Sequence, residues 1–168
     1  MAIHRRDLDV VMEHIKTLEE VTENFFKTNL IYGSVEIFKY FLSLGFDMSK
    51  TTYNCLFTAC GKMDHDPAIV DFILINKLVP TTPKWLEDCL YNASLQQNIQ
   101  IMQLLLLEGA VPSVEIGCNA VKLNNGTMLK LLVDYGLNLD IKNPNNAPDF
   151  SVKRMAEYYG VDINALLS

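Results

Sequence analysis

The chain has 168 residues, of which 49% are apolar and 20% charged, and its formal net charge is −6. This composition is typical of a folded chain that buries a core, and it excludes a disordered one. The 14 Lys and Arg residues form no clustered basic face, and no apolar run approaches the roughly 18 residues of a membrane-spanning helix. We therefore expect neither nucleic acid nor a membrane among its partners.

The cysteines and the first residues of the chain indicate the cellular compartment of the protein. The four cysteines are sparse for this length and form no Cys-x-x-Cys pair, so they do not suggest a disulfide scaffold. The first twenty residues carry charges every few positions and lack the apolar segment of a secretory signal. We expect reduced thiols and a cytoplasmic location.

In chain order, the first predicted element is a short helix in DLDVVMEHI, residues 7–15, which matches the start of SVEIFKYFLSLGF at residues 34–46. Three further copies follow: PAIVDFILINKL at 67–78, NIQIMQLLLLEGA at 98–110 and GTMLKLLVDYGL at 126–137. The four full copies share a central apolar residue, namely Phe41, Ile73, Leu105 and Leu132, so the successive spacings are 32, 32 and 27 residues. Copies that recur every 27 to 32 residues predict a helical repeat.

Local signals predict where the two helices of each repeat begin and end. The first helix has candidate starts in the Thr17–Glu20 capping box, at Thr51 or Thr52, at Thr82 before Pro83, and at Ser113. The second helix is expected to end in a left-handed residue at Gly45, Gly109 and Gly136, with Lys77 at the matching place in one copy. The unit is therefore a helix–turn–helix.

The run from Leu104 to Leu107 is apolar around more than half of a helix, so we expect that helix to be covered on several sides. A stack of helix pairs supplies that cover. The predicted fold is an all-α helical-repeat solenoid that forms one domain over residues 1–168. It comprises a partial repeat at 1–16, helix-pair repeats at 17–49, 50–80, 81–112 and 113–140, and a C-terminal cap at 141–168.

In the tail, IKNPNNAPDF at residues 141–150 predicts a loop, and SVKRMAEYYG predicts one capped helix that ends at Gly160. A terminal repeat must close the last apolar face of a stack. The residues expected to do so are Phe150, Met155, Tyr158, Tyr159, Leu166 and Leu167. A partner-binding tail is the alternative.

The second-helix sequences Asn98–Ala110 and Ser34–Asp47 resemble the second-helix signature of the ankyrin repeat family. Small pairs such as Ala59-Cys60 and Ala93-Ser94 stand where that family has two alanines. The resemblance covers roughly residues 7–140 and implies a helix–turn–helix stack. Two departures are the missing threonine-proline-leucine-histidine opening and the 27-residue steps, which leave the β-hairpin fingers short or missing.

The resemblance also implies a function, because ankyrin repeat proteins bind other proteins through a concave surface. We expect a non-catalytic adaptor that binds another protein, acting as a monomer, with a homodimer as the alternative. Divergent repeats of this kind resemble those of host-directed proteins from intracellular pathogens and large DNA viruses. A self-associating structural repeat protein is the second hypothesis.

The starts of the first helices and the inter-repeat turns line the binding surface in that family. Trp85, the single tryptophan, lies in the first turn of a predicted first helix, and tryptophan is enriched at binding hot spots. Burial of Trp85 against the neighbouring repeat is the alternative. The candidate partner-binding residues are Tyr32, Tyr53, Lys62, Met63, Lys84, Trp85, Gln96 and Gln97.

Signals for catalysis or for metal binding were not found in the sequence. The three histidines share no ligand-type spacing with the cysteines, and no phosphate-binding loop or nucleophile elbow occurs. The cysteines fall at inward positions of first helices, where a thiol is inert, although a Cys60–His65 pair is a formal alternative. We expect no enzyme, no catalytic residue, no metal and no cofactor.

Overall fold

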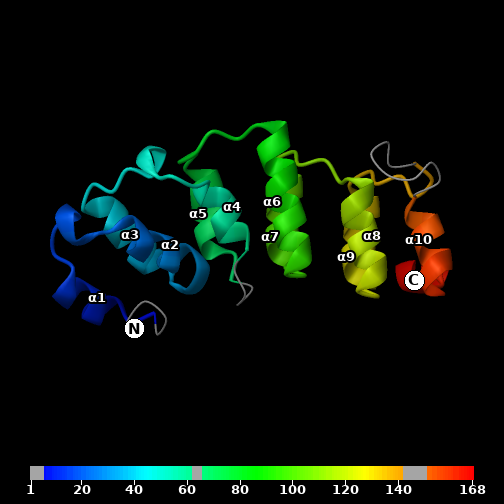
Figure 1. Ribbon diagram of the computed structural model, residues 1–168, viewed down its shortest axis with the longest axis horizontal. Helices are drawn as coiled ribbons and strands as arrows, with labels where there is room; N and C mark the ends of the chain where they lie inside the picture. The colour runs from blue at the N-terminus through cyan, green and yellow to red at the C-terminus, as the bar shows by residue number, and fades with distance from the viewer. Residues whose placement is uncertain (1–5, 62–65, 142–150) are drawn as a thin grey trace. The chain divides into compact units, whose positions relative to one another are not determined.

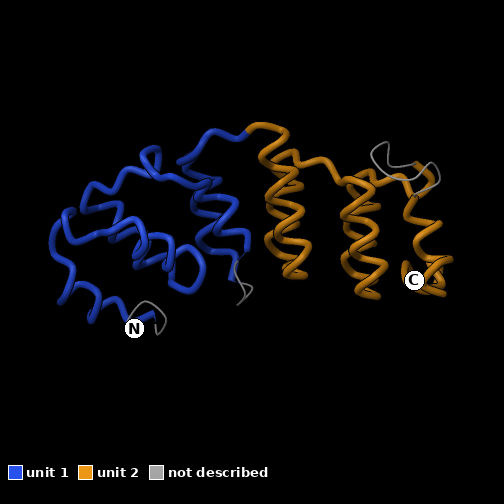
Figure 2. Tube along the Cα trace, viewed as in Figure 1, with its two compact units in different colours: residues 1–81 blue, residues 82–168 orange. Residues whose placement is uncertain are grey.

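The computed structural model describes residues 6–61, 66–141 and 151–168. Over these ranges the chain is all-helical and contains no β-strand, which confirms the predicted fold class at the level of all-α. The chain forms two compact units, residues 1–81 and 82–168 (Figure 2). None of the described helices is long and apolar enough to cross a membrane. The expected single repeat domain stays a prediction.

Unit 1 is built from two helix pairs preceded by a short helix (Figure 1). Its elements are α1 (Leu8–His14), η2 (Leu18–Glu20), α2 (Glu23–Tyr32), α3 (Val35–Ser43), η3 (Met48–Lys50), α4 (Cys55–Cys60) and α5 (Ala68–Ile75). Helix α2 packs on α3, and α4 packs on α5. The pairs also pack on each other, with α2 against α4 and α3 against α5, while α1 packs on α3.

Unit 2 has two rows of helices. Its elements are α6 (Pro83–Leu95), α7 (Ile99–Leu107), α8 (Val114–Lys122), α9 (Gly126–Asp134), α10 (Val152–Tyr159) and α11 (Ile163–Leu167). In one row α8 packs between α6 and α10, and in the other α9 packs between α7 and α11 (Figure 1). The rows are joined by the pairs α6 with α7 and α8 with α9. We call α6, α8 and α10 the first row.

The second helix of each pair buries the same three positions. These positions are i, i+1 and i+4, which form one stripe along a helix. All twelve side chains are fully buried: Ile37, Phe38 and Phe41 in α3; Ile69, Val70 and Ile73 in α5; Ile101, Met102 and Leu105 in α7; Met128, Leu129 and Leu132 in α9. The 32-, 32- and 27-residue spacing of the sequence is therefore the spacing of the core stripe.

The second helices also end in the same way. Gly45, Gly109 and Gly136 have φ values of 94°, 96° and 94°, and Lys77 has a φ of 49°, so the predicted left-handed ends are confirmed. In each case the next N–H donates to the carbonyl of the central stripe residue. The four bonds are Phe46 to Phe41, Leu78 to Ile73, Ala110 to Leu105 and Leu137 to Leu132, with lengths of 3.2, 3.1, 2.9 and 2.9 Å. This is the Schellman pattern.

Two of the predicted first-helix starts are confirmed: Thr82 caps α6 and Ser113 caps α8. The start expected at Thr51 or Thr52 is wrong, because Asn54 caps α4. Thr51 instead donates to the Met48 carbonyl at 2.8 Å, and Thr52 is bonded to Glu23 in α2.

The capping box of Thr17 and Glu20 forms, but it surrounds the short turn η2. Helix α2 itself begins after Thr22, whose hydroxyl accepts from the Phe25 N–H at 3.2 Å. The sequence therefore identified the capping box correctly and placed the start of the helix five residues early.

The leucine run is covered over most of its length. Leu105 and Leu106 are buried and Leu104 is half-buried. Leu107 is 66% exposed, so the expectation that the whole run is enclosed is wrong at its last residue. Leu107 is the final residue of α7 and lies outside the buried stripe of that helix.

Helix α10 is the predicted tail helix, capped by Ser151 and ended by Gly160 at a φ of 65°. It packs on α8, where Gly117 makes room for the buried side chain of Val152. Met155 is buried as expected, and Leu166 and Leu167 are half-buried. Tyr158 and Tyr159 do not close the core, because they are 82% and 50% exposed. The IKNPNNAPDF segment lies outside the described residues after Ile141, and Phe150 lies outside them too.

Candidate interaction surface

The first turn of α6 presents Trp85 to solvent. Thr82 accepts a hydrogen bond from the Trp85 N–H at 3.2 Å, and Pro83 occupies the first helical position, where its missing N–H has no consequence. Trp85 is 39% exposed, whereas Leu86 beside it is buried. The structure thus places an exposed indole at the start of the longest first-row helix.

Lys84 is engaged by carboxylates of its own helix. Its ammonium lies 3.0 Å from Asp88 and 3.6 Å from Glu87. The hydrogen bond to Asp88 and the charge of Glu87 raise the pKa of Lys84. Because these ion pairs are exposed, they contribute little to stability. With two carboxylates around one ammonium, the group keeps one net negative charge beside Trp85.

Tyr53 is held by contacts inside unit 1. Its side chain is half-buried, its hydroxyl donates to the Glu23 carbonyl at 3.3 Å, and the Lys27 ammonium lies 5.1 Å from its ring centroid. Desolvation raises the pKa of Tyr53. The Glu23 carboxylate accepts from the Thr52 N–H and hydroxyl, and these bonds lower its pKa. Tyr53 therefore ties the η3–α4 connection to α2.

The other candidates are spread over both units. Tyr32 is 42% exposed at the end of α2. Gln96 is half-buried and Gln97 exposed, at the opposite end of α6 from Trp85. Gln97 has a φ of 54°, and its Oε1 accepts from the Asn125 amide at 3.1 Å, so it links the α6–α7 and α8–α9 turns. Lys62 and Met63 lie outside the described residues.

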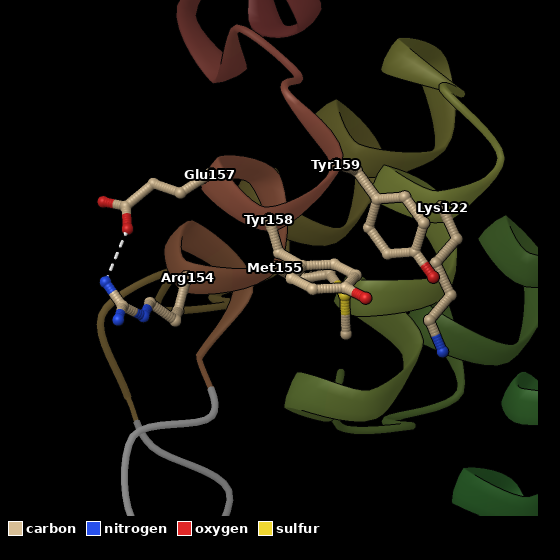
Figure 3. Close-up of a pocket in the computed structure, with 6 residues that line it drawn as sticks. All are labelled: Lys122, Arg154, Met155, Glu157, Tyr158 and Tyr159. Carbon is tan, nitrogen blue, oxygen red and sulfur yellow. Dashed lines mark hydrogen bonds and ion pairs between the residues drawn. The ribbon is translucent and has the colours of Figure 1, made fainter.

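A hollow between α8 and α10 was not expected from the sequence. It has a volume of about 560 Å³. We call it the tyrosine hollow and define it by its described lining, which is Lys122, Arg154, Met155, Glu157, Tyr158 and Tyr159 (Figure 3). The two tyrosine rings meet edge to face, with centroids 5.2 Å apart and an interplanar angle of 84°. No local pattern in the sequence indicated the hollow, because the exposure of Tyr158 and Tyr159 depends on how α10 packs on α8.

The cysteines lie in first helices, as expected: Cys55 and Cys60 in α4, Cys89 in α6 and Cys118 in α8. All four are described and buried, and no disulfide joins them. Burial raises the pKa of Cys118 to about 11 and also raises that of Cys55. Both thiols are therefore protonated at neutral pH. Within the described ranges, no three His, Cys, Asp or Glu side chains gather as metal ligands would.

No family model, no curated protein and no solved structure matches the chain. The ankyrin resemblance therefore depends on the residues quoted for it and stays a prediction.

Proposed function

We propose that the chain is a non-catalytic adaptor that binds a partner protein through the first helices of an ankyrin-like repeat stack. The repeated register carries this proposal. Four second helices share one buried stripe and one left-handed ending, and first helices pack on first helices within each unit. Repeats that pack in this way leave the solvent-facing side of the first helices free, and in a solenoid these sides together form an extended concave binding surface.

Trp85 supports a binding role for that surface. A large aromatic side chain that is 39% exposed on an otherwise ordered helix gives a partner apolar area to bury. The neighbouring charges of Lys84, Glu87 and Asp88 are paired and can form the polar rim that surrounds such an anchor. We place Trp85 at the centre of the interface, on the concave face of the proposed solenoid.

The proposed setting is the cytoplasm, with a host protein as the partner if the chain comes from a pathogen or a virus. The chain acts as a monomer in this account and needs no cofactor.

Self-association of a structural repeat protein is the second candidate. It is favoured by the apolar side chains that the end of α7 leaves exposed, Leu107 at 66% and Val111 at 67%. Sedimentation over a range of protein concentrations separates the two functions. An adaptor keeps the mass of one chain, and a self-associating protein gains mass that Leu107→Asp removes.

Affinity purification from a cell lysate tests the adaptor proposal. The bait is the whole chain, beside Trp85→Ala and the matched control Leu107→Ala, which removes a more exposed apolar side chain from the other row. We expect a partner that wild type and Leu107→Ala retain and Trp85→Ala loses. A partner that Leu107→Ala loses and Trp85→Ala retains would place the site on the opposite row and overturn the proposal.

A further inference from the structure

We propose that the tyrosine hollow binds a short acidic segment of a partner protein, with a carboxylate at Lys122 and an apolar side chain against Tyr158 and Tyr159. This inference rests on the proposed adaptor function and adds the chemistry of the partner. It is carried by three observations: the exposure of the two tyrosines, the charges around them and the size of the hollow.

The two tyrosines present an unusually large aromatic area to solvent. Tyr158 is 82% and Tyr159 50% exposed, while Met155, one turn earlier on α10, is buried and forms the floor. Their edge-to-face contact holds the two rings against each other, which limits their freedom before any partner arrives. Figure 3 shows both hydroxyl groups on the side of Lys122. An apolar side chain that packs on the two rings would bury aromatic area that is now exposed.

The charges select an acidic occupant. Arg154 is bonded to Glu157 at 3.0 Å, so these two side chains neutralise each other. Lys122 is exposed and has no ion pair among the residues that the structure describes, which is also true of Lys130 in the same unit. The hollow thus offers one unmatched positive charge on a chain whose net charge is −6. A carboxylate next to Lys122 is the complement of that charge.

The size of the hollow fits part of a peptide. A volume of about 560 Å³ lies within the range of ligand pockets, which hold roughly 300–1,000 Å³. The described lining comes from the end of α8 and from α10. An extended segment can lie across the hollow with one apolar side chain inserted.

Selection from a phage library of random short peptides against the whole chain tests this assignment. We expect the enriched sequences to carry Asp or Glu within a few residues of an aromatic or aliphatic residue. Synthetic copies should bind at least about tenfold more weakly to Tyr158→Ala and to Lys122→Glu, and replacing their Asp by Asn should weaken them similarly. Leu107→Ala and Lys130→Glu are the matched controls and should bind as wild type does.

Three results would overturn the assignment: no enrichment, enriched peptides without carboxylates, or peptides that bind Tyr158→Ala and Lys122→Glu as tightly as wild type. Both residues are exposed, so an unchanged melting temperature of each variant shows that the fold is intact. The experiments distinguish failure of the hollow assignment from failure of the adaptor proposal. If the lysate partner depends on Trp85 while peptides ignore Tyr158, the hollow assignment falls and the adaptor stands.

Discussion

Gly33 lies so close to Asn29 that a Cβ at position 33 would stand 1.7 Å from the Asn29 Oδ1 atom. Asn29 is fully buried, and its side-chain amide donates to the Ser34 carbonyl at 3.4 Å across the α2–α3 turn. Gly33 has a φ of −84°, so the demand for glycine there is steric and does not come from a left-handed backbone. The close packing of Gly33 on Asn29 therefore leaves no room for a side chain at this turn.

We predict that Gly33→Ala lowers the free energy of unfolding by about 2–3 kcal/mol, because the new methyl group overlaps the buried Asn29 side chain and backbone. Urea denaturation measures the change. Gly109→Ala is the control, since position 109 has a φ of 96° and open space around it, and it should lose only about 1 kcal/mol. Equal losses at the two positions would contradict the steric account.

Gly117→Ala should loosen the docking of α10 on α8. A Cβ at position 117 would lie 2.7 Å from side-chain atoms of both Leu137 and Val152, which are buried. Overpacking of this kind costs about 1–3 kcal/mol. Hydrogen exchange should show faster exchange in α10 with α7 little changed. Glu115→Ala, exposed on the same helix, should leave exchange in α10 as it is in wild type.

Lys77 is the one second-helix ending that uses a side-chain-bearing residue in a left-handed conformation. Lys77→Gly should raise the free energy of unfolding by up to about 1 kcal/mol, because glycine adopts a φ of 49° without the clash of a Cβ. Thermal denaturation checks the sign. Asn76→Gly is the control and should destabilise, since Asn76 has a φ of −88° and gains nothing from glycine.

Burial of Cys118 predicts a loss of stability at alkaline pH. The folded protein holds the pKa of this thiol at about 11, above its ordinary value of 9.0, so the unfolded chain releases the proton first. The stability that the neutral thiol contributes is therefore present below pH 9.0 and is lost as the pH rises toward about 11. Urea titrations at several pH values should show a smaller alkaline decrease for Cys118→Ala than for wild type. Identical pH profiles would contradict the assignment.

The second helices could be predicted from the sequence because their signals are local. An apolar stripe, an N-cap and a glycine at C′ are all read within a dozen residues, and the caps at Ser34, Asn98 and Asn125 each accept from the N–H three residues on. The start of α4 was ambiguous in the sequence, because Thr51, Thr52 and Asn54 are all N-cap residue types. The Thr52 hydroxyl does not cap the helix because it donates to the carboxylate of Glu23, which is 29 positions away. No local sequence pattern predicts that contact.

The candidate site was harder to predict than the fold, because exposure depends on how helices dock. The sequence was compatible with either a buried or a surface position for Trp85, and in the structure its side chain is exposed. The sequence predicts a surface role for Tyr53, yet its hydroxyl donates to the Glu23 carbonyl and its ring lies beside the Lys27 ammonium. Tyr158 was expected to close the core, and its outward direction follows from the face that α10 turns to α8.

Photo-crosslinking in cells tests the central claim, that a partner protein binds the first row of unit 2. A photoreactive phenylalanine derivative replaces Trp85 in one variant and Leu107 in the other, so the two probes stand on opposite rows of the same unit. The account predicts a crosslinked partner from position 85, with position 107 giving none. A partner crosslinked from position 107 and not from position 85 would contradict it.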